Sequence, residues 1–120
     1  MTRFAMSQIV FYHNPRCSKS RAALALLQER GSDIHLIEYL KTPPTVTELE
    51  RLATQLGVPV REMIRSNESV YHELKLDNPA LGEADLLRAI TEHPILLQRP
   101  IAVTGERAVI GRPPGKVLEL

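Results

Sequence analysis

The chain has 120 residues, of which 43% are hydrophobic and 24% are charged, and its formal net charge is +1. That length predicts a single domain, and these proportions are typical of a folded globular protein rather than a disordered one. The balanced charge argues against nucleic acid or an anionic membrane surface as a partner, and no apolar stretch approaches the length of a membrane span. Because the first residues lack a signal-peptide pattern, we expect a cytoplasmic protein.

A strand–helix–strand pattern opens the chain. The run Gln8 to Tyr12 is rich in β-branched and aromatic side chains, which predicts a strand, and Asn14-Pro15 marks a turn. A helix is predicted to begin near Ser18 and to end before Gly31, and a second strand follows over Ile34 to Tyr39. This order favours a βαβ unit with parallel strands.

The middle of the chain is predicted to be helical. Thr45 and Glu48 have the spacing of a capping box, in which each side chain accepts a hydrogen bond from a free backbone N–H of the other residue. The apolar residues that follow repeat at helical spacing, which indicates a buried stripe. The stripe consists of Leu49, Leu52, Ala53 and Leu56, and further helical segments are predicted over Val60 to Arg65, Ser69 to Leu74 and Glu83 to Glu92.

The C-terminal part changes from helical to strand-like periodicity. Ile101 to Val103 and Ala108 to Ile110 predict a hairpin, with Thr104 to Arg107 as a turn slightly longer than the minimum. Pro113-Pro114 ends the second of these strands, and a short helical or irregular tail follows. The whole pattern predicts an α/β protein with a mixed sheet of about four strands.

The chemistry of the sequence centres on Cys17, its one cysteine. At the predicted start of a helix, free backbone N–H groups carry partial positive charge and stabilise a thiolate. The basic neighbours Arg16, Lys19 and Arg21 argue against burial in apolar surroundings. Ser20 stands where a C-x-x-C pair would have its second cysteine, so redox turnover through Cys17 needs an external thiol.

Four further residues are candidates for a site around Cys17. Arg99 and Arg112 each precede a proline at one end of the predicted hairpin, so their guanidinium groups can reach the same sheet edge and bind a tetrahedral oxyanion; two solvated surface arginines are the alternative. Arg65 ends a predicted helical segment, and the partial negative charge of a helix C-terminus already explains a cation at that position. His13 could be protonated and lower the thiol pKa, or be neutral and orient the loop. The histidines show no metal-ligand spacing, so we expect no metal.

Four separated segments together resemble the glutaredoxin-coupled arsenate reductases, the ArsC-like proteins. These segments are His13 to Arg21, Glu38 to Thr45, His93 to Ile101 and Gly111 to Pro114, and the resemblance runs from Gln8 to the end of the chain. It implies a thioredoxin-like fold, with one domain over 1–120, a helical insertion at approximately 45–94, and a cis peptide bond before Pro100.

The resemblance also implies a role for each matching residue. Cys17 matches the nucleophile that attacks arsenate, and His13 matches a loop histidine that helps to keep the thiol ionised. The residues matching the three oxyanion-binding arginines are Arg65, Arg99 and Arg112. Asn14 and Ser20 match loop positions that contribute hydrogen bonds around the cysteine.

The implied reaction is the reduction of arsenate to arsenite, with glutathione as co-substrate, glutaredoxin as protein partner and no bound cofactor. Two other functions stay open at this point. One is a regulatory binding protein of the Spx type, which binds RNA polymerase, although Ser20 breaks the C-x-x-C switch of those regulators. The other is a glutathione-dependent thiol oxidoreductase that acts on a different substrate.

Overall fold

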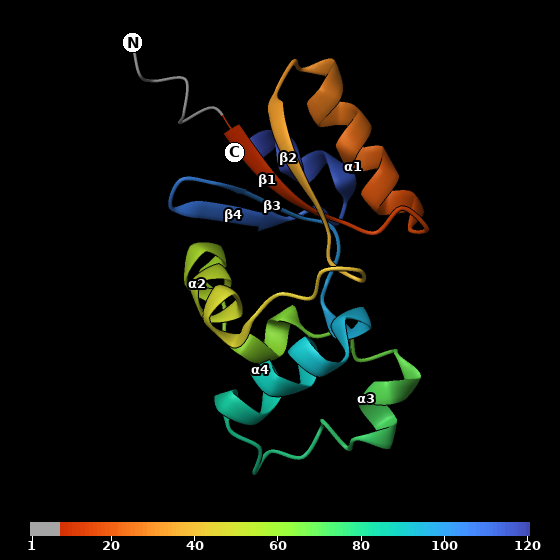
Figure 1. Ribbon diagram of the computed structural model, residues 1–120, viewed down its shortest axis with the longest axis vertical. Helices are drawn as coiled ribbons and strands as arrows, with labels where there is room; N and C mark the ends of the chain where they lie inside the picture. The colour runs from red at the N-terminus through yellow and green to blue at the C-terminus, as the bar shows by residue number, and fades with distance from the viewer. Residues whose placement is uncertain (1–7) are drawn as a thin grey trace. The chain divides into compact units, whose positions relative to one another are not determined.

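The computed structural model describes residues 8–120, which form two compact units (Figure 1). Residues 8–42 and 99–120 make up the sheet unit, which contains all the strands, and residues 43–98 make up the helical unit. The predicted α/β class with a four-stranded mixed sheet is confirmed. Most predicted elements differ from the observed ones by only one or two residues at their ends.

The sheet unit begins with the predicted βαβ motif. Strand β1 (Gln8–His13) and strand β2 (Asp33–Glu38) are parallel, and helix α1 (Ser18–Glu29) connects them. Gly31 follows the helix with a φ of +79°, in the left-handed region, where glycine has no steric penalty. The position of this glycine explains why the helix ends where the sequence predicts.

A hairpin completes the sheet, in the order β2-β1-β3-β4. Strand β3 (Ile101–Thr104) is antiparallel to both β1 and β4 (Arg107–Ile110). The prediction of a longer turn is wrong, because Thr104 pairs directly with Arg107 and only Gly105 and Glu106 lie between the strands. Gly105 has a φ of +58°, which suits a tight two-residue hairpin turn.

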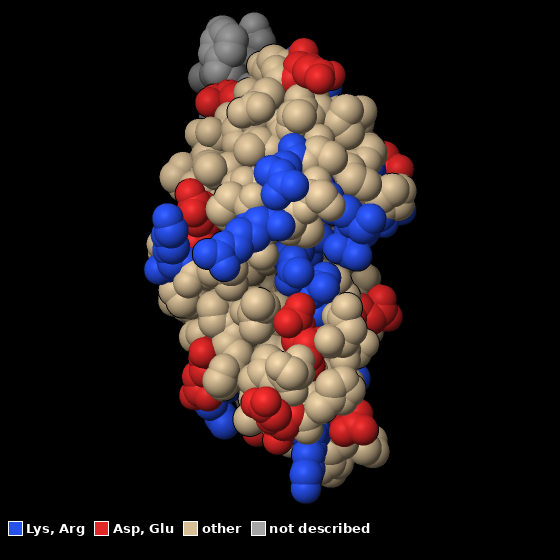
Figure 2. Space-filling model, turned by 90° about the vertical axis from the view of Figure 1, so that its right-hand side faces the viewer, with Lys and Arg blue, Asp and Glu red and all other residues tan. Residues whose placement is uncertain are grey.

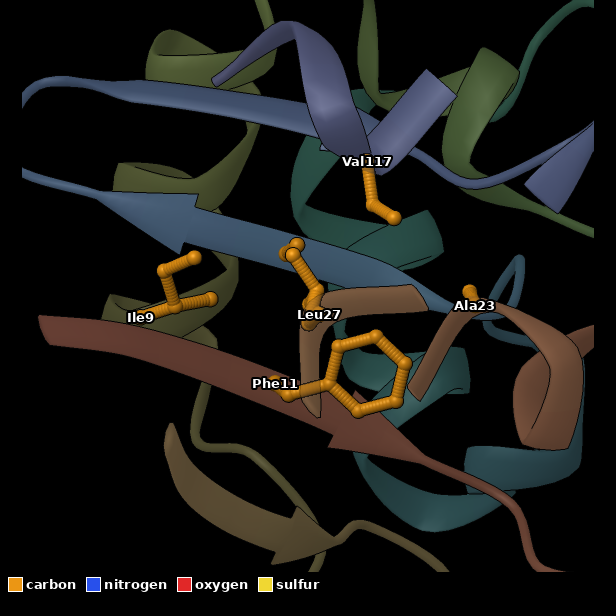
Figure 3. Close-up of a cluster of buried hydrophobic side chains, with 6 residues drawn as sticks. Ile9, Phe11, Ala23, Leu27 and Val117 are labelled. Carbon is orange, nitrogen blue, oxygen red and sulfur yellow. The ribbon is translucent and has the colours of Figure 1, made fainter. Parts of the chain in front are cut away.

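One face of the sheet is covered by α1 and by the C-terminal 3-10 helix η4 (Pro114–Glu119), as Figure 1 shows. Side chains from both helices and from the central strands meet in a buried cluster (Figure 3). The members of this cluster are Ile9, Phe11, Ala23, Leu27, Ala102 and Val117. The apolar spacing of α1 thus fixes the helix against the sheet, and this packing determines where the N-terminus of α1 lies.

Gly111 lies where β4 leads into the tail, and the backbone there is packed closely. A Cβ atom at this position would lie 2.8 Å from Cγ of Pro100 and 3.0 Å from Cγ1 of Val117. Both neighbours are themselves fully buried, so a larger residue would have to displace the core.

The helical unit contains the predicted middle helices. Thr45 and Glu48 form the capping box at the start of α2 (Val46–Leu56), with the two side chain-to-backbone distances at 3.1 and 2.9 Å. The other elements are the 3-10 helix η2 (Val60–Met63), α3 (Ser69–Glu73), α4 (Glu83–Glu92) and the 3-10 helix η3 (Pro94–Leu96). Buried apolar residues of α2, η2 and α4 form the interior of this unit, among them Leu49, Leu52, Met63, Leu86 and Ile90.

Candidate active site

Cys17 is the N-cap residue of α1, as its place in the sequence predicts. Its backbone is extended, with φ −95° and ψ 122°, and the Arg21 N–H donates to its carbonyl oxygen to begin the helical hydrogen bonding. The Cys17 N–H donates to the Asn14 carbonyl at 3.0 Å, which closes the turn before the helix. The side chain is partly exposed. The sulfur is therefore accessible to a reactant at the positive end of the helix dipole.

Buried hydrogen bonds hold the loop between β1 and α1. Ser20 Oγ lies 2.7 Å from Nδ1 of His13 and accepts a hydrogen bond from the Asn14 N–H at 3.1 Å. All three residues are buried, and the Asn14 side-chain oxygen accepts from the Arg16 N–H at 3.0 Å. Asn14 and Ser20, which the sequence picked out as loop support, thus fix the backbone on both sides of Cys17.

His13 is the last residue of β1, directly before this loop. Burial lowers the pKa of His13, Arg21 lowers it further, and the nearby Glu38 carboxylate opposes both effects. The net lowering favours the neutral imidazole at neutral pH. Of the two roles that the sequence left open, this environment favours the neutral ring that orients the loop through Ser20.

The strand registers bring four distant segments to the same edge of the sheet. At the carboxyl end of β1, His13 pairs with Glu38 on β2, and Tyr12 pairs with Ile101 on β3. On the other side of β3, Ile101 pairs with Ile110. Continuing these registers by one or two residues gives a single row across the sheet, which we call the terminal row. The terminal row consists of Tyr39, Asn14, Arg99 and Arg112.

Hydrogen bonds connect the chain beyond β3 and β4 at the two arginines of this row. The Gly111 N–H donates to the Pro100 carbonyl at 2.8 Å, and Nη1 of Arg112 donates to the Arg99 carbonyl at 3.3 Å. The bond between Arg99 and Pro100 is a cis peptide, which confirms that prediction, and the bond between Arg112 and Pro113 is also cis. Both arginines thus lie at one sheet edge, as the sequence indicated.

The pKa of Cys17 lies below its ordinary value. Burial alone would raise this pKa, but hydrogen bonds from the Ser20 and Lys19 N–H groups and from the Arg99 side chain stabilise the thiolate and outweigh burial. The decisive cation is therefore Arg99, which is distant in the sequence. Among the basic residues next to Cys17 in the sequence, Arg21 donates to the Pro15 carbonyl at 2.8 Å.

Arg65 belongs to the helical unit. Its Nε donates to Oε2 of Glu68 at 3.0 Å, and its backbone N–H donates to the Leu96 carbonyl at 2.7 Å. The prediction that a helical segment extends to Arg65 is wrong, because η2 ends at Met63 and Ile64 forms a β-bridge with Leu97. Its guanidinium is thus anchored by a carboxylate of its own unit.

Tyr39 is the member of the terminal row that sequence reasoning missed. It follows β2 directly, and none of its surface is exposed. Burial raises the pKa of Tyr39, with Arg99 and Asn14 lowering it and Cys17 raising it further. Its position as the last residue of a predicted strand was the available signal, because that strand is parallel to the one that leads into the cysteine loop.

The side of the sheet unit that carries the β1–α1 loop faces the viewer in Figure 2, and Lys and Arg side chains gather there. Such a surface attracts anions. Within residues 8–120, no three His, Cys, Asp or Glu side chains come together as metal ligands would. Every helix in that same range is too short or too polar to cross a lipid bilayer.

A βαβ unit followed by an antiparallel hairpin, with a cysteine at the start of the first helix and a cis-proline before the adjacent strand, defines a thiol protein with a thioredoxin-like fold. The ArsC family model matches residues 12–120. The chain belongs to the ArsC family.

Individual relatives agree with this assignment. An arsenate reductase of Neisseria meningitidis serogroup A is 50% identical over 109 residues, which cover 90% of this chain and 93% of that protein. An arsenate reductase of Haemophilus influenzae is 46% identical over 113 residues, covering 93% and 97% of the two chains. The solved structure of an arsenate reductase from Vibrio cholerae is 49% identical, has a TM-score of 0.92, and covers 94% of this chain and 97% of its own.

Proposed function

We propose that this protein is an arsenate reductase, which reduces arsenate to arsenite with external thiols as the source of electrons. The observation that carries the proposal is a thiolate-stabilised Cys17 in contact with Arg99, at the sheet edge that also holds Arg112. Two family members that are 50% and 46% identical to this chain are named arsenate reductase, which supports arsenate as the oxyanion.

In the proposed reaction, the Cys17 thiolate attacks arsenic and one arsenate oxygen leaves as water after protonation. Arg99 and Arg112 neutralise charge on the remaining oxygens through paired hydrogen bonds. Arg65 is included as a third oxyanion-binding arginine on the strength of the family resemblance. His13, Asn14 and Ser20 keep the loop in the conformation that presents the thiolate, so their role is positioning.

The two electrons must come from outside the chain, because the sequence contains one cysteine and cannot form an internal disulfide. We propose that glutathione adds as a second thiol and that glutaredoxin completes the reduction. Arsenic gains two electrons, two thiols leave as a disulfide, and arsenite is released as the Cys17 thiolate is regenerated. We also propose that the protein works in the cytoplasm, where reduced glutathione is abundant.

The proposal is tested by arsenate-dependent NADPH oxidation in the presence of glutathione, glutaredoxin and glutathione reductase. We expect turnover by the unaltered protein, loss of turnover in Cys17→Ser, and a raised KM for arsenate in Arg99→Gln, Arg112→Gln and Arg65→Gln. Arg107→Gln is the matched control, because Arg107 is exposed and donates to the Glu119 carbonyl. Absence of any Cys17-dependent arsenate turnover would contradict the proposal. Turnover of a disulfide substrate that persists in the Arg99 and Arg112 variants would favour a different glutathione-dependent reaction.

A further inference from the structure

The Tyr39 hydroxyl lies at the sheet edge near Cys17 and Arg99, and the proposed reaction assigns it no role. It immediately follows β2, and its neighbour in the terminal row is Asn14, which follows β1. Arg99 is the next residue of that row, on the far side of Asn14. Tyr39 is therefore the end residue of the terminal row, and Asn14 separates it from Arg99.

The Tyr39 side chain is fully buried, including its hydroxyl. The hydroxyl lies within interaction range of the Asn14 and Arg99 side chains, yet it forms no hydrogen bond of standard geometry with any of residues 8–120. A phenol oxygen can accept more than one hydrogen bond, and Asn14 and Arg99 both lower the pKa of Tyr39 as donors do, so a small side-chain adjustment lets the hydroxyl accept from the guanidinium and from the Asn14 amide N–H. Buried polar groups rarely lack such partners without a functional reason.

We propose that Tyr39 is a positioning residue, whose hydroxyl holds the Arg99 guanidinium beside the Cys17 sulfur and couples it to the Asn14 loop. Arg99 in turn stabilises the thiolate through a side-chain hydrogen bond. Since Asn14 also accepts the Cys17 N–H at its carbonyl, one phenol would align both the cation and the loop that present the sulfur.

The role belongs to the hydroxyl rather than to the ring. The ring fills space in the interior, as any buried aromatic does, and phenylalanine would fill the same space. Because burial raises the pKa of Tyr39, the phenol stays protonated at neutral pH and keeps its donor. Removing only the oxygen therefore separates positioning from packing.

The experiment compares the unaltered protein with Tyr39→Phe. We expect the Cys17 pKa, followed by the ultraviolet absorbance of the thiolate against pH, to rise by about half a pH unit. We expect KM for arsenate to rise by about three- to tenfold, with a smaller change in kcat, because a hydrogen bond to a charged group is lost. Tyr71→Phe makes the same chemical change in the helical unit and should alter neither quantity.

A double-mutant comparison tests that Tyr39 acts through Arg99. In an Arg99→Ala background, Tyr39→Phe should leave the Cys17 pKa unchanged, because no guanidinium is left to position. An unchanged Cys17 pKa in the single Tyr39→Phe variant would overturn the proposal, and so would an equal shift in both backgrounds. The arsenate part rests on the proposed function, but the thiolate titration needs no arsenate. A protein without arsenate turnover but with the expected titration would refute the proposed function and support the role of Tyr39.

Discussion

Replacing Ser20 with alanine separates the scaffolding of the cysteine loop from the ionisation of the thiol. The Ser20 hydroxyl is completely buried and interacts with both the His13 ring nitrogen and the Asn14 N–H. Alanine removes this shared partner and leaves both groups buried without it. Each unsatisfied group costs about 1–3 kcal/mol, so we expect Ser20→Ala to lower the free energy of unfolding by about 2–6 kcal/mol.

The same substitution should leave the Cys17 pKa low. Ser20 stabilises the thiolate through its backbone N–H, which alanine retains. Urea unfolding measures the stability, and for an m-value of about 1.3 kcal/mol/M the expected loss moves the midpoint down by about 1.5–4.5 M. Titration of the thiolate on the folded variant measures the pKa.

Ser18→Ala is the matched control, since Ser18 is exposed in the first turn of the same helix and should change stability by less than about 0.5 kcal/mol. The reasoning is refuted if Ser20→Ala costs no more than this control. It also fails if the variant is folded but its Cys17 pKa has returned to the ordinary thiol value, because the hydroxyl would then act on the sulfur directly.

Three further outcomes are expected. Cys17→Ser should abolish arsenate turnover but change the free energy of unfolding by less than about 1 kcal/mol, because the side chain is partly exposed; a large loss in urea unfolding would instead indicate a structural cysteine. Arg112→Ala should lower kcat/KM for arsenate by about ten- to a hundredfold while leaving thermal stability almost unaltered, and a normal kcat/KM would remove this arginine from the site. As the pH falls, His13 is protonated near pH 6.5 in the unfolded chain but only at a lower pH in the folded protein, because its pKa there is lowered. The free energy of unfolding should therefore fall as the pH drops below about 6.5. His13→Gln should flatten this part of the stability–pH curve, and an unchanged slope would contradict the lowered pKa.

Elements with local signals were predicted well from the sequence. Helix α2 begins directly after its N-cap Thr45 because the capping box lies within four consecutive residues, and α1 ends where Gly31 permits the left-handed turn. The position of Cys17 at a helix start follows from the same kind of evidence. In each case, neighbouring residues determine the conformation, so the sequence contains the whole signal.

Features that depend on distant pairing could not be read in this way. The 3-10 helix η2 ends at Met63 because Ile64 pairs with Leu97, a partner more than thirty residues away. Likewise, the residues next to Cys17 do not show that the Arg99 side chain stabilises the thiolate. Local charge patterns cannot show which side chains a folded sheet brings to the sulfur.

The candidate site was therefore partly predictable. The hairpin topology placed Arg99 and Arg112 at one sheet edge, and the structure agrees. Tyr39 escaped notice because finding it required the exact parallel register between β1 and β2, which periodicity does not provide. The assignment of Arg65 to the oxyanion site stays a prediction, which the Arg65→Gln variant tests.

The terminal row makes the chemistry of the protein sensitive to strand alignment. Side chains alternate between the two faces of a sheet, so a slip of one residue in any pairing would turn one row member to the opposite side. Gly111, wedged against Pro100 and Val117, leaves little room for such a slip next to Arg112. A one-residue insertion into the Gly105-Glu106 turn that shifts β4 against β3 would therefore yield a folded but less active protein, in which Cys17 and Arg99 keep their places and the Arg112 side chain has turned to the opposite face.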